Sequence, residues 1–248
     1  MKFQILATTL CLLAALPADA AERKSKKAEK EAQDSSPILM SKTGGGDIWA
    51  DVKELTAAAD KGNRTAQAQL GELLLRGSAE HKVTRDLPKA VAMLEQAARA
   101  GEPSAAFRIG MLLDDAEIFL PDRSRALAYF RAAAAGGAGE AFHNIGAAYA
   151  GGRGVRPDLA EALGWLILAG KHGASTEAEK ALRAQLEARD GHLFIRLGES
   201  RAVDIEQELA ARKVVEWLPA PAPLVPLATA AAQAAPKTAP ARPAAKQR

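Results

Sequence analysis

A set of positions recurs at a fixed spacing along this chain, and this periodicity restricts the fold more than any other feature. Asp158 is followed by Ala162, Trp165 and Gly173, and shifts of 36 residues towards the N-terminus, taken once and twice, recover an equivalent set each time. The equivalent residues are Val155, Phe119 and Val83; Asp158, Asp122 and Asp86; Ala162, Ala126 and Ala90; Trp165, Tyr129 and Met93; and Gly173, Gly137 and Gly101. Such phase-locked recurrence of chemically different residues is typical of a helical solenoid.

Within one repeat the pattern predicts two helices joined by a glycine-rich turn. Ala141, Ile145 and Tyr149 recur at helical spacing, and the pattern breaks at residues 151–154, where three glycines occur. Asp158 is placed to cap the second helix, because its carboxylate can accept hydrogen bonds from the free amides of the first turn. We therefore predict an all-α superhelix of stacked hairpins, with full repeats at residues 64–101, 102–137 and 138–173.

Glycines recur on the first helix of each predicted hairpin, and we interpret them as sites of close helix approach. Gly146 and Gly110 are 36 residues apart, whereas Gly71 lies 39 residues before Gly110, which indicates a three-residue insertion near residues 78–82. On the second helices, three large side chains are expected to fill the space between stacked hairpins. These are Leu94, Phe130 and Leu166.

The third repeat contains, in order, Ala141, Ile145-Gly146, Tyr149, Gly152-x-Gly154-Val155, Asp158, Ala162-x-x-Trp165, Ala169 and Gly173. This succession is similar to the Sel-one-like repeat, a relative of the tetratricopeptide repeat. The first two repeats depart from it, since Leu74 and Leu113 replace Tyr149 and Met93 replaces Trp165. The resemblance implies a right-handed superhelix of paired antiparallel helices that usually binds other proteins, and it supplies no catalytic residues.

The segments on either side of the repeats differ from them in composition. Residues 47–61 predict one capping helix, and residues 176–217 predict a capping pair whose second helix begins at Ala202, after a turn region at 190–200. Residues 21–46 are charged and glycine-containing, and residues 218–248 are rich in proline and alanine. Neither segment can bury enough apolar surface to offset its chain entropy, so we predict a disordered linker at 21–46 and a disordered tail at 218–248.

Residues 1–20 have the features of a secretory signal peptide. Lys2 precedes an apolar run, and Ala18-Asp19-Ala20 matches a small-x-small cleavage site. The apolar run is too short to cross a bilayer, which needs about 20 residues. We therefore predict cleavage before Ala21, a periplasmic or secreted bacterial protein, and a mature chain without a thiol, because the one cysteine, Cys11, lies in the signal.

The charge of the predicted folded region argues against nucleic-acid binding. The whole chain has a formal net charge of +3, but residues 47–217 contain 22 Lys and Arg against 25 Asp and Glu, a net charge of −3. A nucleic-acid-binding fold would present a basic face on its folded part. The basic residues of the tail could attract anionic polymers of the cell envelope through weak, salt-sensitive contacts. They are Lys237, Arg242, Lys246 and Arg248.

The residue types that support catalysis or metal binding form no recognisable set. His81, His143, His172 and His192 are spread over a turn, a first helix, a helix end and a loop, without the spacing of metal ligands. The neighbours Asp114 and Asp115 point apart on a helix. The glycines at 151–154 lack the preceding strand and the Lys-Ser/Thr pair of a phosphate-binding loop. We therefore expect no catalytic activity and no metal or other cofactor.

In solenoids of the resembled type, the first helices line the concave side, and their positions that do not pack inward define the expected protein-binding face. Phe107 and Met111 stand out, because an aromatic side chain beside a methionine is a suitable anchor for a bound peptide. The alternative, that a neighbouring helix or the superhelical twist buries these side chains, is equally open. The full candidate set is Ala68, Glu72, Leu75, Phe107, Met111, Asp114, Glu140, His143 and Ala147.

The sequence thus predicts an exported, non-catalytic scaffold or adaptor that binds a partner protein. The alternative is an enzyme or binding protein that acts on cell-wall glycan or peptidoglycan fragments. Some exported relatives of the resembled family have been linked to penicillin-type ligands, but those relatives are rich in cysteine and this chain is not.

Overall fold

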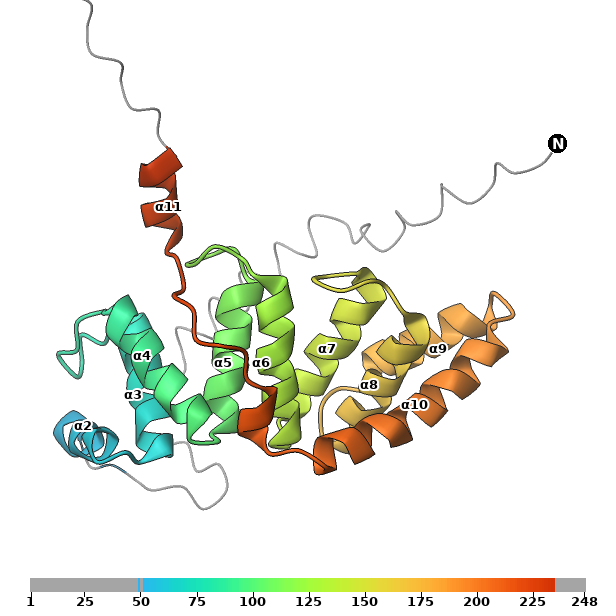
Figure 1. The fold of residues 1–248 in the computed structure, drawn as a ribbon, viewed down its shortest axis with the longest axis horizontal. Helices are drawn as coiled ribbons and strands as arrows, with labels where there is room; N and C mark the ends of the chain where they lie inside the picture. The colour runs from blue at the N-terminus through green and yellow to red at the C-terminus, as the bar shows by residue number, and fades with distance from the viewer. Residues whose placement is uncertain (1–48, 50, 235–248) are drawn as a thin grey trace, which may run out of the picture. The chain divides into compact units, whose positions relative to one another are not determined.

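The computed structural model of the protein describes residue 49 and residues 51–234. Between Val52 and Ala210, helices follow one another along the chain and most of them form pairs (Figure 1). The predicted signal peptide at 1–20, the predicted linker at 21–46 and the tail beyond residue 234 lie outside the described residues. Among the residues that the structure describes, no strand forms, and the prediction of an all-α solenoid of helical hairpins is confirmed.

Three hairpins of similar length form the central part of the protein. In each, a first helix of 12 or 13 residues is paired with a second helix of 13 residues. The hairpins are α3 (Arg64–Arg76) with α4 (Leu87–Arg99), α5 (Pro103–Asp114) with α6 (Arg123–Ala135), and α7 (Gly139–Gly151) with α8 (Leu159–Lys171).

The second helix of each hairpin begins at the predicted aspartate. Asp86 accepts a hydrogen bond from the Lys89 amide, and Asp122 accepts one from the Arg125 amide. Asp158 accepts two, from the amides of Ala160 and Glu161, at 2.9 Å each. The aspartate caps are therefore confirmed in all three hairpins, and they set the point at which each second helix starts.

Small residues on the first helix of each hairpin face large residues on the second. A Cβ atom added at Gly71 would lie 2.7 Å from Leu94 Cγ, and one added at Gly110 would lie 2.6 Å from the ring of Phe130. Gly146 is related in the same way to Leu166, at 2.7 Å. The predicted close approach within each hairpin is confirmed. Leu166 also belongs to a buried cluster with Leu182 and Leu186, which follow the third hairpin, as expected for a residue that fills space between successive helix pairs.

One helix covers the N-terminal side of the repeats. Helix α2 (Val52–Asp60) is capped by Asp51 and buries Leu55 and Ala59. The buried Gln67 side chain of α3 donates a hydrogen bond of 3.2 Å to the carbonyl oxygen of Ala59, at the end of α2. This bond satisfies a polar group in the core and ties α2 to the first repeat.

The C-terminal pair differs from its prediction. Helix α9 (Glu177–Glu187) lies within the predicted first helix, but α10 (His192–Ala210) runs through the segment expected to be a turn, and His192 opens it rather than lying in a loop. Gly198, in the middle of this segment, lies inside α10, where a Cβ would come within 2.8 Å of Leu163 Cβ on α8. The glycine is required for helix packing and does not end the helix.

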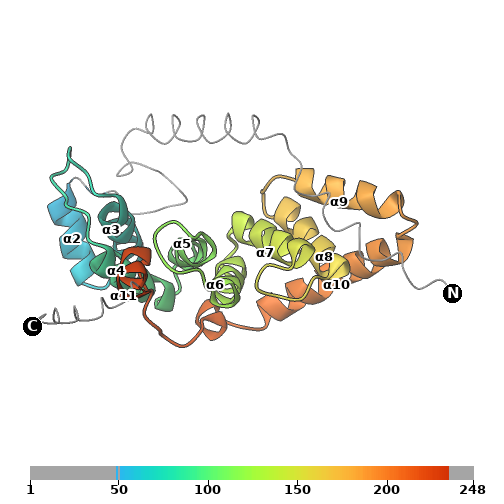
Figure 2. The ribbon, with the colours of Figure 1, turned by 90° about the horizontal axis from the view of Figure 1, so that it is seen from above.

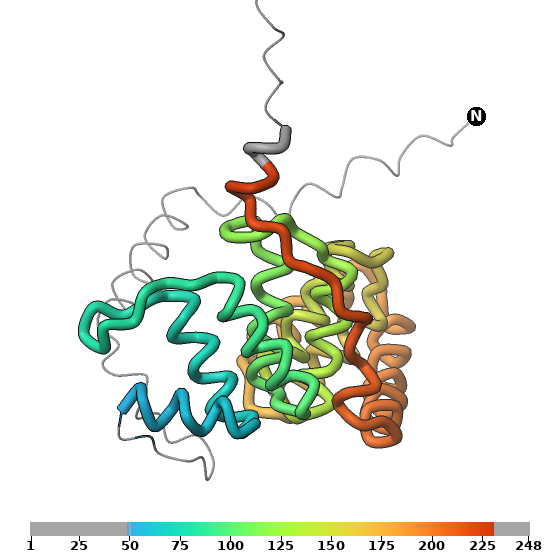
Figure 3. The backbone as a smooth tube through the Cα atoms, turned by 60° about the vertical axis from the view of Figure 1, so that its left-hand side comes forward, coloured from blue at the N-terminus to red at the C-terminus, as the bar shows by residue number. Residues whose placement is uncertain are grey.

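Part of the predicted disordered tail is placed against the repeats. After a short 3-10 helix, η2 (Val214–Trp217), residues 218–226 run in an extended form across the side of α6 and α4, and helix α11 (Leu227–Ala234) follows (Figures 2 and 3). We call residues 218–226 the strap. The strap differs from the prediction because the repeats, not the strap itself, supply its hydrogen-bond donors and its apolar contacts.

Candidate protein-interaction surface

The predicted binding face on the first helices is only partly accessible. Ala68 and Leu75, on α3, are 7% and 3% exposed, so they belong to the core. Helix α3 packs against both α2 and α4, which leaves little of its surface open. These two residues therefore do not lie on the expected face, and the alternative of burial by neighbouring helices holds for them.

Phe107 and Met111, on α5, are half-buried. The ring of Phe107 lies 5.7 Å from that of Phe130, with a tilt of 45°, so it contributes to the packing of α5 on α6. The sulfur of Met111 lies 3.6 Å from the side-chain nitrogen of Asn144, on α7. Met111 thus bridges two successive first helices and keeps part of its side chain at the surface.

The candidate acidic residues on α3 and α5 form ion pairs between repeats. Glu72 Oε1 lies 2.7 Å from Arg108 Nε, which links α3 to α5. Asp114 Oδ2 lies 2.8 Å from Arg153 Nη1, which links α5 to the turn after α7. The carboxylates of Glu72 and Asp114 are 23% and 14% exposed, so their first role is to join neighbouring hairpins.

On α7 the predicted positions are more open. Glu140 is exposed, and His143 and Ala147 are half-buried. Together with Met111 they form an accessible strip over α5 and α7, which we call the first-helix strip. Of the nine candidate residues, these four are the ones that a partner can reach without breaking an ion pair or an aromatic contact that the structure describes.

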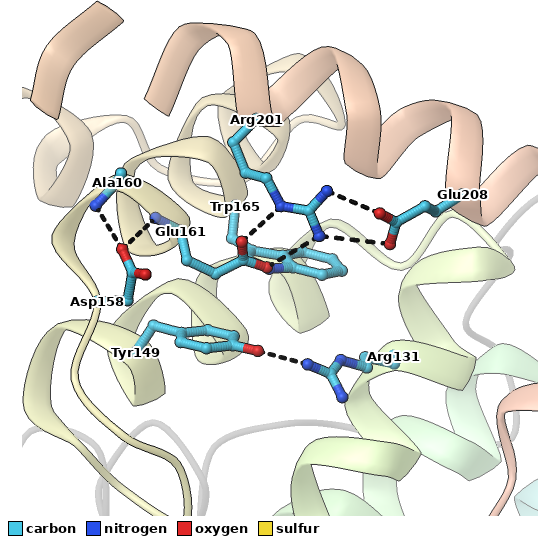
Figure 4. Close-up of polar contacts among 8 residues, drawn as sticks. All are labelled: Arg131, Tyr149, Asp158, Ala160, Glu161, Trp165, Arg201 and Glu208. Carbon is cyan, nitrogen blue, oxygen red and sulfur yellow. Dashed lines mark hydrogen bonds and ion pairs between the residues drawn. The ribbon is translucent and has the colours of Figure 1, made fainter. Parts of the chain in front are cut away.

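A second polar cluster lies on α8 and α10, and the sequence did not predict it. Figure 4 shows the guanidinium of Arg201, on α10, between the carboxylates of Glu161 and Glu208 and beside the Trp165 indole. Arg201 Nε donates to Glu161 Oε2 at 2.5 Å and Nη1 donates to Glu208 Oε1 at 2.7 Å. The Trp165 indole nitrogen donates to the other Glu161 oxygen at 2.9 Å, so this half-buried carboxylate is paired on both sides.

Arg131, on α6, extends this cluster towards the second repeat. Its guanidinium donates a hydrogen bond of 2.5 Å to the Tyr149 hydroxyl, on α7 (Figure 4). A pocket of about 230 Å³ opens beside the cluster, and Arg131 lines it together with Trp165 and Arg201. Its other lining residues are Glu161, Ile205, Glu208, Leu209, Arg212 and Trp217.

The pKa shifts in this region follow from burial and pairing. Burial raises the pKa of the Tyr149 hydroxyl, and the positive charge of Arg131 opposes this effect. The hydrogen bond from Arg201 lowers the pKa of the Glu208 carboxyl. Hydrogen bonds to Glu208 and Glu161 raise the pKa of Arg201 itself. At neutral pH the tyrosine is therefore a neutral hydroxyl and the ion pair is fully charged, an arrangement that fixes α10 rather than one poised for proton transfer.

The described residues form neither a metal-ligand group nor a membrane-spanning helix. No three His, Cys, Asp or Glu side chains in the described part of the chain are grouped as metal ligands. Likewise, none of the helices between residues 51 and 234 is both long and apolar enough to cross a membrane. His172 lies at the end of α8 and stacks on Phe142, with ring centroids 4.5 Å apart, so it is used in packing.

The sequence interpretation missed the Arg201 cluster because it missed the first half of α10. The Glu161–Trp165 spacing of four on a predicted helix was the one available signal, since it places a carboxylate one turn from an indole nitrogen. Nothing in the sequence indicated that Arg201, 40 residues from Glu161, would complete the cluster.

Comparison with known proteins identifies the hairpins. The Sel1 repeat matches residues 65–102, 103–137 and 140–173. One similar solved structure is a Sel1 repeat protein from Oxalobacter formigenes, which is 25% identical over 54% of this chain and 97% of that one, with a TM-score of 0.46. Another is a protective antigen with an SLR fold, present in uropathogenic Escherichia coli strains. It is 26% identical over 85% of this chain and 46% of that one, with a TM-score of 0.52. No curated protein matches the chain.

Proposed function

Because this chain is a Sel1 repeat protein, with three repeats between residues 65 and 173, we propose that it is an exported, non-catalytic scaffold that binds another protein. Sel1 repeat proteins are commonly protein-interaction scaffolds. Export rests on the signal-like residues 1–20, with their Ala18-Asp19-Ala20 site. The binding surface that we assign to this function is the first-helix strip over α5 and α7.

The observation that carries this assignment is the position of Met111. Its side chain touches Asn144 across the junction of the second and third repeats, and it remains half-buried rather than fully covered. A flexible thioether at such a junction can adapt to an apolar side chain of a partner. Glu140 and His143 provide polar contacts at the edge, as is usual for an interface with an apolar centre and a polar rim.

The test is capture of a partner from an envelope extract by the full chain and by a Met111→Ser, Ala147→Glu variant. We expect capture to fall strongly, because the variant removes the apolar anchor and adds a charge beside it, while helicity and melting temperature stay close to those of the original chain. Phe107 is left unchanged, since its contact with Phe130 would confuse loss of binding with loss of packing.

The matched control is Leu197→Ser on α10, which removes an exposed apolar side chain, 47% accessible, from a different surface. Equal capture by the original chain and the Met111→Ser, Ala147→Glu variant would show that the binding site does not lie on α5 and α7. The same preparation tests export by intact mass: the chain recovered from the envelope should begin at Ala21, and a form that retains Cys11 would contradict cleavage.

A further inference from the structure

The strap is held to the repeats through its main chain, and two arginines donate two of the three hydrogen bonds that the structure describes between them. Arg125 Nη2, on α6, donates to the carbonyl oxygen of Ala222 at 2.8 Å. Arg99 Nη2, on α4, donates to the carbonyl oxygen of Pro219 at 3.3 Å. Both bonds reach a peptide oxygen that any residue would offer, so they recognise an extended chain rather than a particular side chain.

The third hydrogen bond comes from the turn between α5 and α6, where the Leu120 amide donates to the Val225 carbonyl oxygen at 2.8 Å. Directly after the strap, the Leu227 amide of α11 donates to the Ile118 carbonyl oxygen of the same turn at 3.0 Å. Phe119 and Pro226 lie opposite each other as an isolated antiparallel bridge. Short antiparallel pairing of this kind is how many proteins bind an extended peptide.

The composition of the strap explains why the repeats supply most of the donors. Four of its nine residues are proline, at 219, 221, 223 and 226, so these positions have carbonyl oxygens but no amide hydrogens. Proline also restricts the unbound chain to extended conformations, which lowers the entropy lost when such a chain is bound. A surface with guanidinium donors therefore suits a proline-rich segment.

The strap occupies this site incompletely. Residues 220–223 are exposed, and only residues 218, 219 and 224–226 are half-buried. Beside the strap remains a groove of about 540 Å³, lined on the side of the repeats by Leu113, Leu120, Pro121, Asp122, Arg123, Ser124, Arg125 and Gly154. The groove offers both apolar and cationic surface that the strap leaves uncovered.

We propose that this surface, formed by α4, α6 and the turn between α5 and α6, is a binding site for an extended, proline-rich segment of another protein, and that the strap is its intramolecular competitor. The site is distinct from the first-helix strip, and its assignment does not depend on that strip. Displacement is feasible because every hydrogen bond described between the strap and the repeats can be remade by another chain of the same backbone form.

The linker between α10 and the strap determines how strongly the strap competes with a free peptide for the site. The strap begins eight residues after α10 ends, and a short linker gives an effective concentration on the order of millimolar. A free peptide at micromolar concentration therefore binds poorly while the strap is seated. Release of the strap should raise the apparent affinity for such a peptide by about tenfold or more.

The probe is a fluorescein-labelled peptide with the sequence of residues 218–228, LPAPAPLVPLA, and binding is measured by fluorescence anisotropy on the full chain. The strap is released by Leu224→Lys with Val225→Lys, because these side chains line the groove beside Arg123 and Arg125 and would place like charges together. The matched control is Ala228→Lys with Thr229→Lys, which adds the same charge at exposed positions of α11.

The groove is tested in the released chain by Arg125→Met, which keeps the aliphatic stem and removes the donors, and by Arg189→Met as the control at an exposed position after α9. We expect the released chain to bind the probe about tenfold more tightly than the original chain or the α11 control. Arg125→Met should weaken that binding several-fold, and Arg189→Met should not.

Three results would overturn the proposal. The probe binding equally to the original and released chains would show that the strap does not compete. No binding to a released chain that keeps its helicity would show that there is no such site. Binding unaffected by Arg125→Met would place the peptide elsewhere. None of these results bears on partner capture by the first-helix strip, which the Met111 variant tests separately.

Discussion

Helix α8 packs most extensively against two helices of different origin, α7 and α10, and the contrast between these contacts shows how the repeat pattern ends. Towards α7, its partner in the third hairpin, α8 presents Leu166 to Gly146. Towards α10, which belongs to no predicted hairpin with α8, it presents Leu163 to Gly198 in the same way. One helix therefore uses the same pairing of small and large residues twice, on two faces.

The two contacts differ in what surrounds that pairing. At the α7 contact one glycine is enough, whereas at the α10 contact both helices carry one: a Cβ added at Gly164 would lie 3.1 to 3.3 Å from atoms of Gly198, Arg201 and Ala202. The α10 contact also carries the Arg201 ion pairs. Helix α10 thus combines backbone proximity with charge pairing, whereas a regular repeat relies on apolar packing and an aspartate cap.

Truncation of the two leucines should give the largest effects and tests whether the contacts are equally tight. Leu163 is fully buried and Leu166 is 3% exposed, so Leu163→Ala and Leu166→Ala should each reduce the free energy of unfolding by about 2 to 5 kcal/mol. Urea denaturation followed by circular dichroism measures both. A much smaller loss for Leu163→Ala would show that α10 is a loosely attached end and not an equal partner of α8.

Removal of the guanidinium of Arg201 should have an intermediate effect and concerns the α10 contact alone. Arg201→Met should cost about 1 to 3 kcal/mol, because Glu161 is half-buried and would keep only the Trp165 indole as partner. Arg183→Met, which breaks ion pairs of α9 with Glu179 and Glu199, is the control and should cost less, since α9 is the less closely packed helix.

The Arg201 variant should also change the pH dependence of stability. Arg201 lowers the pKa of Glu208 in the folded protein, so the pair stabilises the fold above the ordinary glutamate pKa of about 4.3. This contribution is lost as the pH falls through the lowered folded pKa. Melting temperatures between about pH 3 and pH 7 should therefore fall less steeply on the acid side for Arg201→Met. Parallel curves for the two proteins would contradict a role of this pair in acid stability.

Loss of a helix cap should give the smallest effect and concerns the regular hairpin. Asp158→Ala removes the acceptor for two amides and should cost about 1 kcal/mol, whereas Asp158→Asn should retain most of the stability. Helix α10 begins after Gly191 without a side-chain cap, so α8 depends on a local interaction that α10 lacks. Differential scanning calorimetry measures the change, and an unchanged melting temperature for Asp158→Ala would mean that packing alone determines where α8 begins.

The sequence alone determined the hairpins, because the interactions that form them are local and repeat along the chain. Asp86, Asp122 and Asp158 cap helices through amides two or three residues away. Gly71, Gly110 and Gly146 meet large residues 20 to 23 positions further along, at a spacing that the period reveals. A period of this kind can be recognised before any contact is seen.

Only the tertiary structure decided the rest, because it depends on contacts between residues far apart in the chain. Ala68 and Leu75 have the helical phase of surface residues but are buried by packing, and Arg201 reaches Glu161 across 40 residues. The strap has the composition of a disordered tail, yet Arg125 binds its main chain from 97 residues away. Composition describes what a segment can bury by itself, and it contains no information about donors that another part of the fold provides.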